Sequence, residues 1–181
     1  MQEILCVVCV LCVLCGELLV TGCAAKPKAT TPATGPVALD PDKEVRARCV
    51  PPVGWTALAP RTVGLGREVV WLSPTGRTAY GVIHFTMPLP VGHEMALWGF
   101  LDQMKKNEGG ATLVSKQWDE QLRGMRFVAD SGVHYVRTNL VVRGFSGWAV
   151  YAGTLSRGPV EPGELELAEH AREATIMGLG D

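Results

Sequence analysis

The sequence predicts an α+β domain: an antiparallel sheet of about six strands with helices packed on it. About six apolar segments of strand length lie between residues 68 and 155, and turn-forming links join most of them. Two longer segments, 93–107 and 163–177, carry apolar residues at helical spacing instead. Consecutive strands with short links pair antiparallel, and helices cover the apolar face of such a sheet.

The first elements are short apolar runs bounded by prolines and glycines. They are predicted as edge pieces at 48–50 and 55–58 and as strands at 68–73 and 78–87. Between the two strands, Ser73 to Arg77 has the composition of a turn, because Pro74 fixes its own φ and Gly76 accepts a positive φ. Residues 68–87 therefore predict a β-hairpin.

A helix is predicted at 93–107. Its apolar side chains recur at helical spacing and are expected to face the sheet: Met95, Trp98, Leu101 and Met104. The glycines Gly109 and Gly110 then end the helix.

A strand meander and a second helix complete the domain. The strands are predicted at 112–118, 125–129, 133–142 and 148–155. Pro162 opens a helix at 163–177, and Gly178 is its expected C-cap. The expected buried face of this helix is Leu165, Ala168, Ala171, Thr175 and Ile176.

The N-terminal segment ends in Val20-Thr21-Gly22-Cys23. The apolar run before it, Ile4 to Cys15, is too short to span a membrane as a stable helix. This arrangement resembles the signal peptide and lipobox of bacterial lipoproteins. The resemblance implies that residues 1–22 are a signal peptide and that Cys23 is lipidated. An uncleaved membrane anchor is the alternative, and it gives a similar location.

Residues 23–47 are predicted to be the lipidated cysteine and a tether, which leaves 48–181 as the α+β domain. Proline, threonine and alanine dominate the tether, and it has no aromatic residue to build a core. At about 3.1 Å per residue it reaches at most roughly 75 Å. Residue 24 is not the aspartate that tends to hold lipoproteins at the inner membrane, so the outer membrane of a diderm bacterium is favoured.

Charge and cysteine content exclude several function classes. All 17 basic residues follow residue 22, and two of the 18 acidic residues precede it, so the cleaved chain keeps 17 basic and 16 acidic residues, a net charge of +1. Nucleic acid is therefore not an expected partner. The cysteines before residue 16 are separated only by valine and leucine, so they are interpreted as apolar residues rather than iron–sulfur ligands. Cys49 is the one thiol left, which excludes an internal disulfide.

The element order resembles the PsbP-like fold. The resemblance covers roughly residues 48–178, from Pro52-Val53-Gly54-Trp55 to the closing helix segment Glu164 to Glu169. It implies an α/β/α sandwich and favours a binding or accessory protein over an enzyme, although one fold hosts unrelated roles.

The patterns that would indicate catalysis or metal binding are incomplete. His93-Glu94 does not continue as H-E-x-x-H. Gly144 to Gly147 departs from the G-x-S-x-G nucleophile motif, because Trp148 holds the fifth position, and it is predicted as a hairpin turn. His84 and His134 would meet only if their predicted strands were neighbours. No catalytic residue, metal site or cofactor is therefore assigned.

Trp118 is the exception among the five tryptophans, because its neighbours in the sequence are polar. An exposed tryptophan beside Arg123 and Arg126 is typical of a contact with a protein partner. The acidic pair Asp119-Glu120 is expected to be solvated.

The sequence thus favours a non-enzymatic, lipid-anchored envelope lipoprotein whose domain binds or scaffolds a protein. One alternative is a periplasmic carrier of a small apolar ligand, with a pocket lined by Met95, Trp98 and Met104. The other is a hydrolase that uses His84 or His134.

Overall fold

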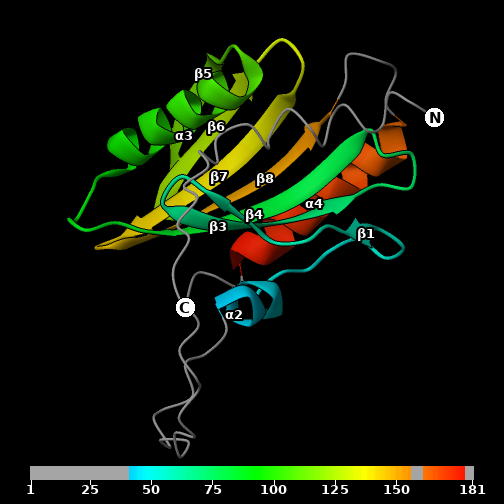
Figure 1. Ribbon diagram of the computed structural model, residues 1–181, viewed down its shortest axis with the longest axis horizontal. Helices are drawn as coiled ribbons and strands as arrows, with labels where there is room; N and C mark the ends of the chain where they lie inside the picture. The colour runs from blue at the N-terminus through cyan, green and yellow to red at the C-terminus, as the bar shows by residue number, and fades with distance from the viewer. Residues whose placement is uncertain (1–40, 156–160, 178–181) are drawn as a thin grey trace, which may run out of the picture. The chain divides into compact units, whose positions relative to one another are not determined.

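The computed structural model describes residues 41–155 and 161–177. These residues form one antiparallel sheet with helices on both of its faces (Figure 1). The α+β class and the antiparallel sheet are therefore confirmed. The predicted signal peptide, Cys23, residues 24–40 and Gly178 lie outside the described residues.

The sheet has eight strands over the described residues, rather than about six. The strands are β1 (Thr56–Ala57), β2 (Arg61–Val63), β3 (Gly66–Leu72), β4 (Thr78–Thr86), β5 (Thr112–Asp119), β6 (Gly124–Asp130), β7 (Tyr135–Arg143) and β8 (Ser146–Thr154). Their order is β1-β3-β4-β8-β7-β6-β5, and β2 also pairs with β3. The edge piece predicted at 55–58 contains the short strand β1, whereas the piece predicted at 48–50 is not a strand. β2 was not predicted, because its three residues are too few to show a strand period in the sequence.

The helices are α2 (Pro41–Ala47), α3 (His93–Glu108) and α4 (Pro162–Met177). α3 packs on β6 and β7, whereas α4 packs on β4 and β8 on the opposite face, where the strands partly hide it in Figure 1. No pattern in the sequence indicated α2, which lies inside the predicted tether. Val45 of α2 is 1% exposed and belongs to the core beneath α4, so residues 41–47 are packed on the domain.

Each face of the sheet has its own apolar core, because side chains alternate along each strand. The core under α3 includes Leu97, Leu101, Phe127, Leu140 and Tyr151. The core under α4 includes Val69, Trp71, Tyr80, Val82 and Val150. β4 and β8 pair with Gly81 opposite Tyr151. This pairing favours a glycine at residue 81, because the ring of Tyr151 occupies the space that a Cβ at residue 81 would fill.

The predicted inner face of α3 was half wrong. Leu101 and Met104 are buried as expected, but the other inward residues are Ala96 and Leu97. Successive residues turn by 100°, so the stripe through the buried residues leaves residue 95 on the far side of the helix and residue 98 on its flank. The predicted inner face of α4 fits better: Ala168, Ala171, Thr175 and Ile176 are buried, and Leu165 is partly buried.

Candidate functional site

Strand β5 forms one edge of the sheet and, among the described strands, pairs with β6 alone. Most of its side chains are exposed. Trp118 lies opposite Met125, which belongs to the core under α3, so Trp118 is on the α3 face of the sheet. The residue is 47% exposed, and its ring and the His93 ring form a T-shaped contact with their centroids 4.9 Å apart. The predicted exposure of Trp118 is therefore confirmed.

Two more large apolar side chains of α3 remain exposed on the side away from the core. Met95 is 63% exposed and Trp98 is 56% exposed. Glu94, one helical turn before Trp98, pairs with Lys116 of β5 at 2.5 Å, which ties this part of α3 to the edge strand. We call Met95, Trp98 and Trp118 the Trp118 surface. Apolar side chains that remain in water around one edge are a candidate contact for a partner.

The structure does not bring Arg126 to the Trp118 surface. Arg126 follows Met125 on β6, so its side chain lies on the opposite, α4 face of the sheet. There its guanidinium donates to Asp119 Oδ2 at 2.6 Å and to Glu173 Oε1 of α4 at 2.9 Å. Arg126 therefore links β5, β6 and α4. Trp118 is left without this predicted partner.

Asp119 is the last residue of β5, and Arg123 lies in the turn between β5 and β6. Arg123 is exposed and has a positive φ of 50°. Asp119 was expected to be solvated, but its side chain is only 15% exposed. Its Oδ1 accepts the backbone N–H of Leu122 at 2.9 Å. That hydrogen bond, followed by the contact with Arg126, holds the pKa of Asp119 below its usual value. Asp119 thus stabilises the turn.

Strand β7 is tied to α4 by further hydrogen bonds and ion pairs. Arg172 is buried on α4, and its guanidinium donates to Asn139 of β7 and to Glu169. Arg137 of β7 also reaches Glu169, at 3.3 Å. These charges are paired with one another, so they hold the helix against the strands.

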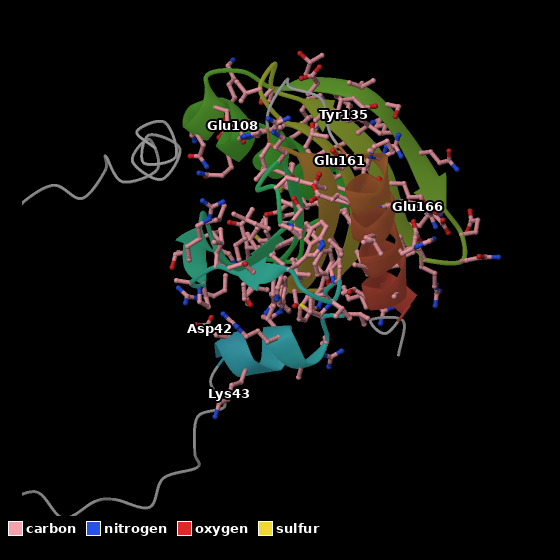
Figure 2. The ribbon with its side chains drawn as sticks, turned by 90° about the vertical axis from the view of Figure 1, so that its right-hand side faces the viewer. Asp42, Lys43, Glu108, Tyr135, Glu161 and Glu166 are labelled. Carbon is pink, nitrogen blue, oxygen red and sulfur yellow. The ribbon has the colours of Figure 1, made fainter. Side chains whose placement is uncertain are left out.

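The histidines occupy separate sites. His84 and His134 do not meet, because β8 lies between β4 and β7 and His134 precedes β7. His134 Nδ1 is 2.9 Å from Oε2 of Glu108, the last residue of α3. Figure 2 labels Glu108. His93 Nε2 accepts the backbone N–H of Val142 at 3.1 Å. Burial lowers the pKa of His93, so the neutral ring that this bond requires is favoured.

His84 has a hydroxyl neighbour that the sequence did not indicate. Its Nε2 is 2.8 Å from Ser146 Oγ, and its ring stacks on Trp148 at 4.1 Å. Ser146 is the first residue of β8, directly after the turn that joins β7 and β8. The predicted hairpin turn at Gly144 to Gly147 is therefore confirmed, but it also places a hydroxyl beside an imidazole.

A buried carboxylate at the other sheet edge also escaped the sequence reasoning. Glu68 of β3 is 4% exposed, and its Oε1 accepts the Tyr151 hydroxyl at 2.7 Å. Its Oε2 forms an ion pair with Arg61 of β2. Burial, and next the nearby Glu68 charge, raise the pKa of Tyr151 well above 10, so the phenol stays a donor. A glutamate directly before Val69-Val70-Trp71 was the available signal, because a charge in a buried strand needs partners.

The pocket expected for a carrier does not form from the three predicted residues. Met104 is buried in the core, whereas Met95 and Trp98 are exposed on the other side of α3. Within residues 41–155 and 161–177, no cluster of three histidine, cysteine or acidic side chains has the geometry of a metal site.

Comparison with known proteins adds no relationship: no protein-family model matches the chain, and no curated protein is significantly similar to it. None of the helices in the described part of the chain is both long and apolar enough to cross a membrane.

Proposed function

We propose that this protein is a lipid-anchored envelope lipoprotein whose α+β domain binds a protein partner and is not an enzyme. The lipobox-like Val20-Thr21-Gly22-Cys23 supports the anchor. The observation that carries the binding role is the Trp118 surface: its three large apolar side chains stay 47–63% exposed, and Trp118 lies on β5, which pairs with β6 alone among the described strands.

A partner that covers the Trp118 surface would gain free energy, because it removes apolar side chains from water. Full burial of an exposed large apolar side chain gains about 1.5–3 kcal/mol, and roughly half of that remains to be gained for each of these half-exposed side chains. Tryptophan is enriched among the residues that dominate protein interfaces, since it combines a large apolar area with one N–H donor. His93 packs against one edge of the Trp118 ring and limits its motion, which reduces the entropy lost on binding.

The proposal includes a PsbP-like domain and an outer-membrane location. Helices on both faces of an antiparallel sheet, with the order strand pair, helix, four-strand meander and helix, support that fold assignment. The alanine after Cys23 supports the outer membrane in a diderm bacterium.

The anchor is tested by expression of the full chain and a Cys23→Ser variant in a diderm bacterium. The expected wild-type product has an intact mass that fits cleavage before Cys23 plus acyl groups, and it needs detergent for release from the outer-membrane fraction. The serine variant should keep its signal peptide and lack the lipid. An unmodified, soluble wild-type product would refute the anchor.

The binding role is tested by chemical crosslinking in intact cells, with a Trp118→Ala variant. The variant is expected to lose most of the crosslinked partner while its melting temperature stays the same. Leu167→Ala is a matched control, because Leu167 is an apolar residue 49% exposed on α4, on the other face. Equal capture by Trp118→Ala and wild type would contradict the proposal.

One observation favours a second function, a hydrolase. Ser146 Oγ lies 2.8 Å from His84 Nε2, which is the reach that a nucleophile and its general base need. In that case Ser146 would attack an ester or amide carbonyl while His84 accepts its proton. Covalent labelling by a fluorophosphonate, lost in both Ser146→Ala and His84→Ala, would support this function, and an unlabelled wild-type protein would exclude it.

A further inference from the structure

The free edge at β5 is built in a way that allows it to pair with a copy of itself. A β-bulge between Leu113 and Ser115 interrupts the register with β6, and the register is regular from Ser115 to Asp119. The regular segment therefore has five residues, and Gln117 is at its centre. A two-fold antiparallel pairing that uses the whole segment must place Gln117 opposite Gln117 of the second copy.

This register places complementary side chains opposite one another. Lys116 would lie opposite Trp118 of the second copy, and the pair occurs twice because of the two-fold axis. Both residues are on the α3 face of their own sheet. An ammonium over an indole is a favourable cation–π contact. On the other face Ser115 would lie opposite Asp119, a hydroxyl donor opposite a carboxylate. No like charges face each other in this register.

A lysine on an edge strand ordinarily discourages pairing, because its charge would be desolvated. Here Glu94 already neutralises Lys116 at 2.5 Å within the same chain. Trp98, one helical turn after Glu94, keeps an exposed indole on the side of α3 that the Glu94–Lys116 pair ties to β5. The edge therefore combines unpaired backbone groups, a compensated charge and an apolar flank.

We infer that the partner at the Trp118 surface is a second copy of this chain, joined by antiparallel pairing of β5 with β5 about a two-fold axis at Gln117. This inference rests on the proposed binding role and names its partner. The two sheets would become one continuous sheet, with α3 of both copies on the same face. Each dimer would carry two lipidated cysteines, so it would bind the membrane more tightly than one copy.

The test is a photo-crosslinking amino acid at position 117 of the full chain, expressed in the diderm envelope. The expected product is a covalent homodimer, in which mass spectrometry finds the peptide around position 117 of one copy joined to the same peptide of the other copy. The matched control places the same group at Gln121, an exposed residue of the β5–β6 turn, and should give at most a tenth of the adduct.

The outcomes separate this inference from the proposed function. An adduct with a different protein would overturn the homodimer while the binding role stands. No adduct at position 117, with Trp118→Ala still affecting capture, would also overturn the homodimer. No adduct and no effect of Trp118→Ala would overturn both.

A charge swap tests the register itself. The double variant Lys116→Glu with Glu94→Lys keeps an ion pair within the chain, so the fold is expected to persist. It places a carboxylate opposite Trp118 of the second copy, and the homodimer adduct should fall at least fivefold. An unchanged yield would overturn the Lys116–Trp118 pairing.

Discussion

The two edges of the sheet are built in opposite ways. At one edge β1 and β2 are two and three residues long, prolines precede or separate them, and an ion pair joins the half-exposed Arg61 to the buried Glu68. At the other edge β5 has eight residues, exposed side chains and the solvent-exposed pair Lys116–Glu94. Short strands and prolines protect an edge from pairing. Within residues 41–155 and 161–177, the chain therefore closes one edge with its own short strands and adds no strand beyond β5 at the other.

α2 strengthens the closed edge. Arg67 of β3 donates to both carboxylate oxygens of Asp42, at 2.9 and 2.7 Å, and Val45 packs in the core below. The contact with Arg67 lowers the pKa of Asp42, so this pair persists in mildly acidic solution. A bidentate arginine–carboxylate pair fixes orientation as well as charge.

The largest expected effect is at the closed edge. Glu68→Ala leaves the buried Tyr151 hydroxyl without its acceptor and Arg61 without its partner. Removing one member of a buried pair costs several kcal/mol; since Arg61 is about half exposed, we expect a loss of about 2–3 kcal/mol in the free energy of unfolding. Urea denaturation measures it. Glu94→Ala, at the open edge, is the matched control and should change stability by less than about 0.5 kcal/mol.

A substitution at Gly81 in the central strand β4 should lower the stability of the fold almost as much. Gly81→Ala places a methyl group where the Tyr151 ring lies, so the ring must move and disturb its hydrogen bond to Glu68. Overpacking of this kind costs about 1–3 kcal/mol. The urea midpoint should fall, whereas Gly99→Ala, which meets only open space on α3, should not lower it. Equal midpoints for Gly81→Ala and wild type would contradict this packing.

A smaller effect is expected from acidification at the open edge. Burial lowers the pKa of His93 from its ordinary 6.5, so the unfolded chain binds a proton more readily than the folded chain. Stability should therefore be complete above pH 6.5 and fall as the pH drops from there through the folded pKa. Protonation also removes the acceptor for the Val142 N–H. Urea midpoints of wild type and His93→Gln across this range should diverge; parallel curves would contradict it.

The smallest effect on stability is expected at Trp118 itself. Its indole is half exposed and packs on the His93 ring, so Trp118→Ala should change the free energy of unfolding by less than about 0.5 kcal/mol. Thermal unfolding of a dilute sample checks this value. A loss above 2 kcal/mol would mean that Trp118 is a core residue and would remove the main support for the binding role.

Much of the fold was predictable from local pattern. The strands from β3 to β8 and both long helices lie within a few residues of their predicted positions, because their apolar runs and glycine-rich turns are strong local signals. α2 escaped because only Val45 among its described side chains is in the core, and one apolar residue makes no period. The sequence also could not show that Met95 and Trp98 would miss the sheet.

The candidate site was predictable only in part. Trp118 was recognisable because its neighbours in the sequence are polar. Arg126 is near Trp118 in the sequence, but the alternation of side chains along β6 places Arg126 on the other face of the sheet. The Glu68–Tyr151 and His84–Ser146 contacts join residues 83 and 62 positions apart, which no local pattern reveals.

The sequence by itself determined the α+β class, the order of the main elements and the exposed character of Trp118, since each depends on residues close together in the chain. Only the tertiary structure decided which strand became the free edge, which face of α3 stayed in water and which charges met. Those outcomes depend on pairing between distant segments: β8 inserts between β4 and β7, and β5 is left at the end of the sheet.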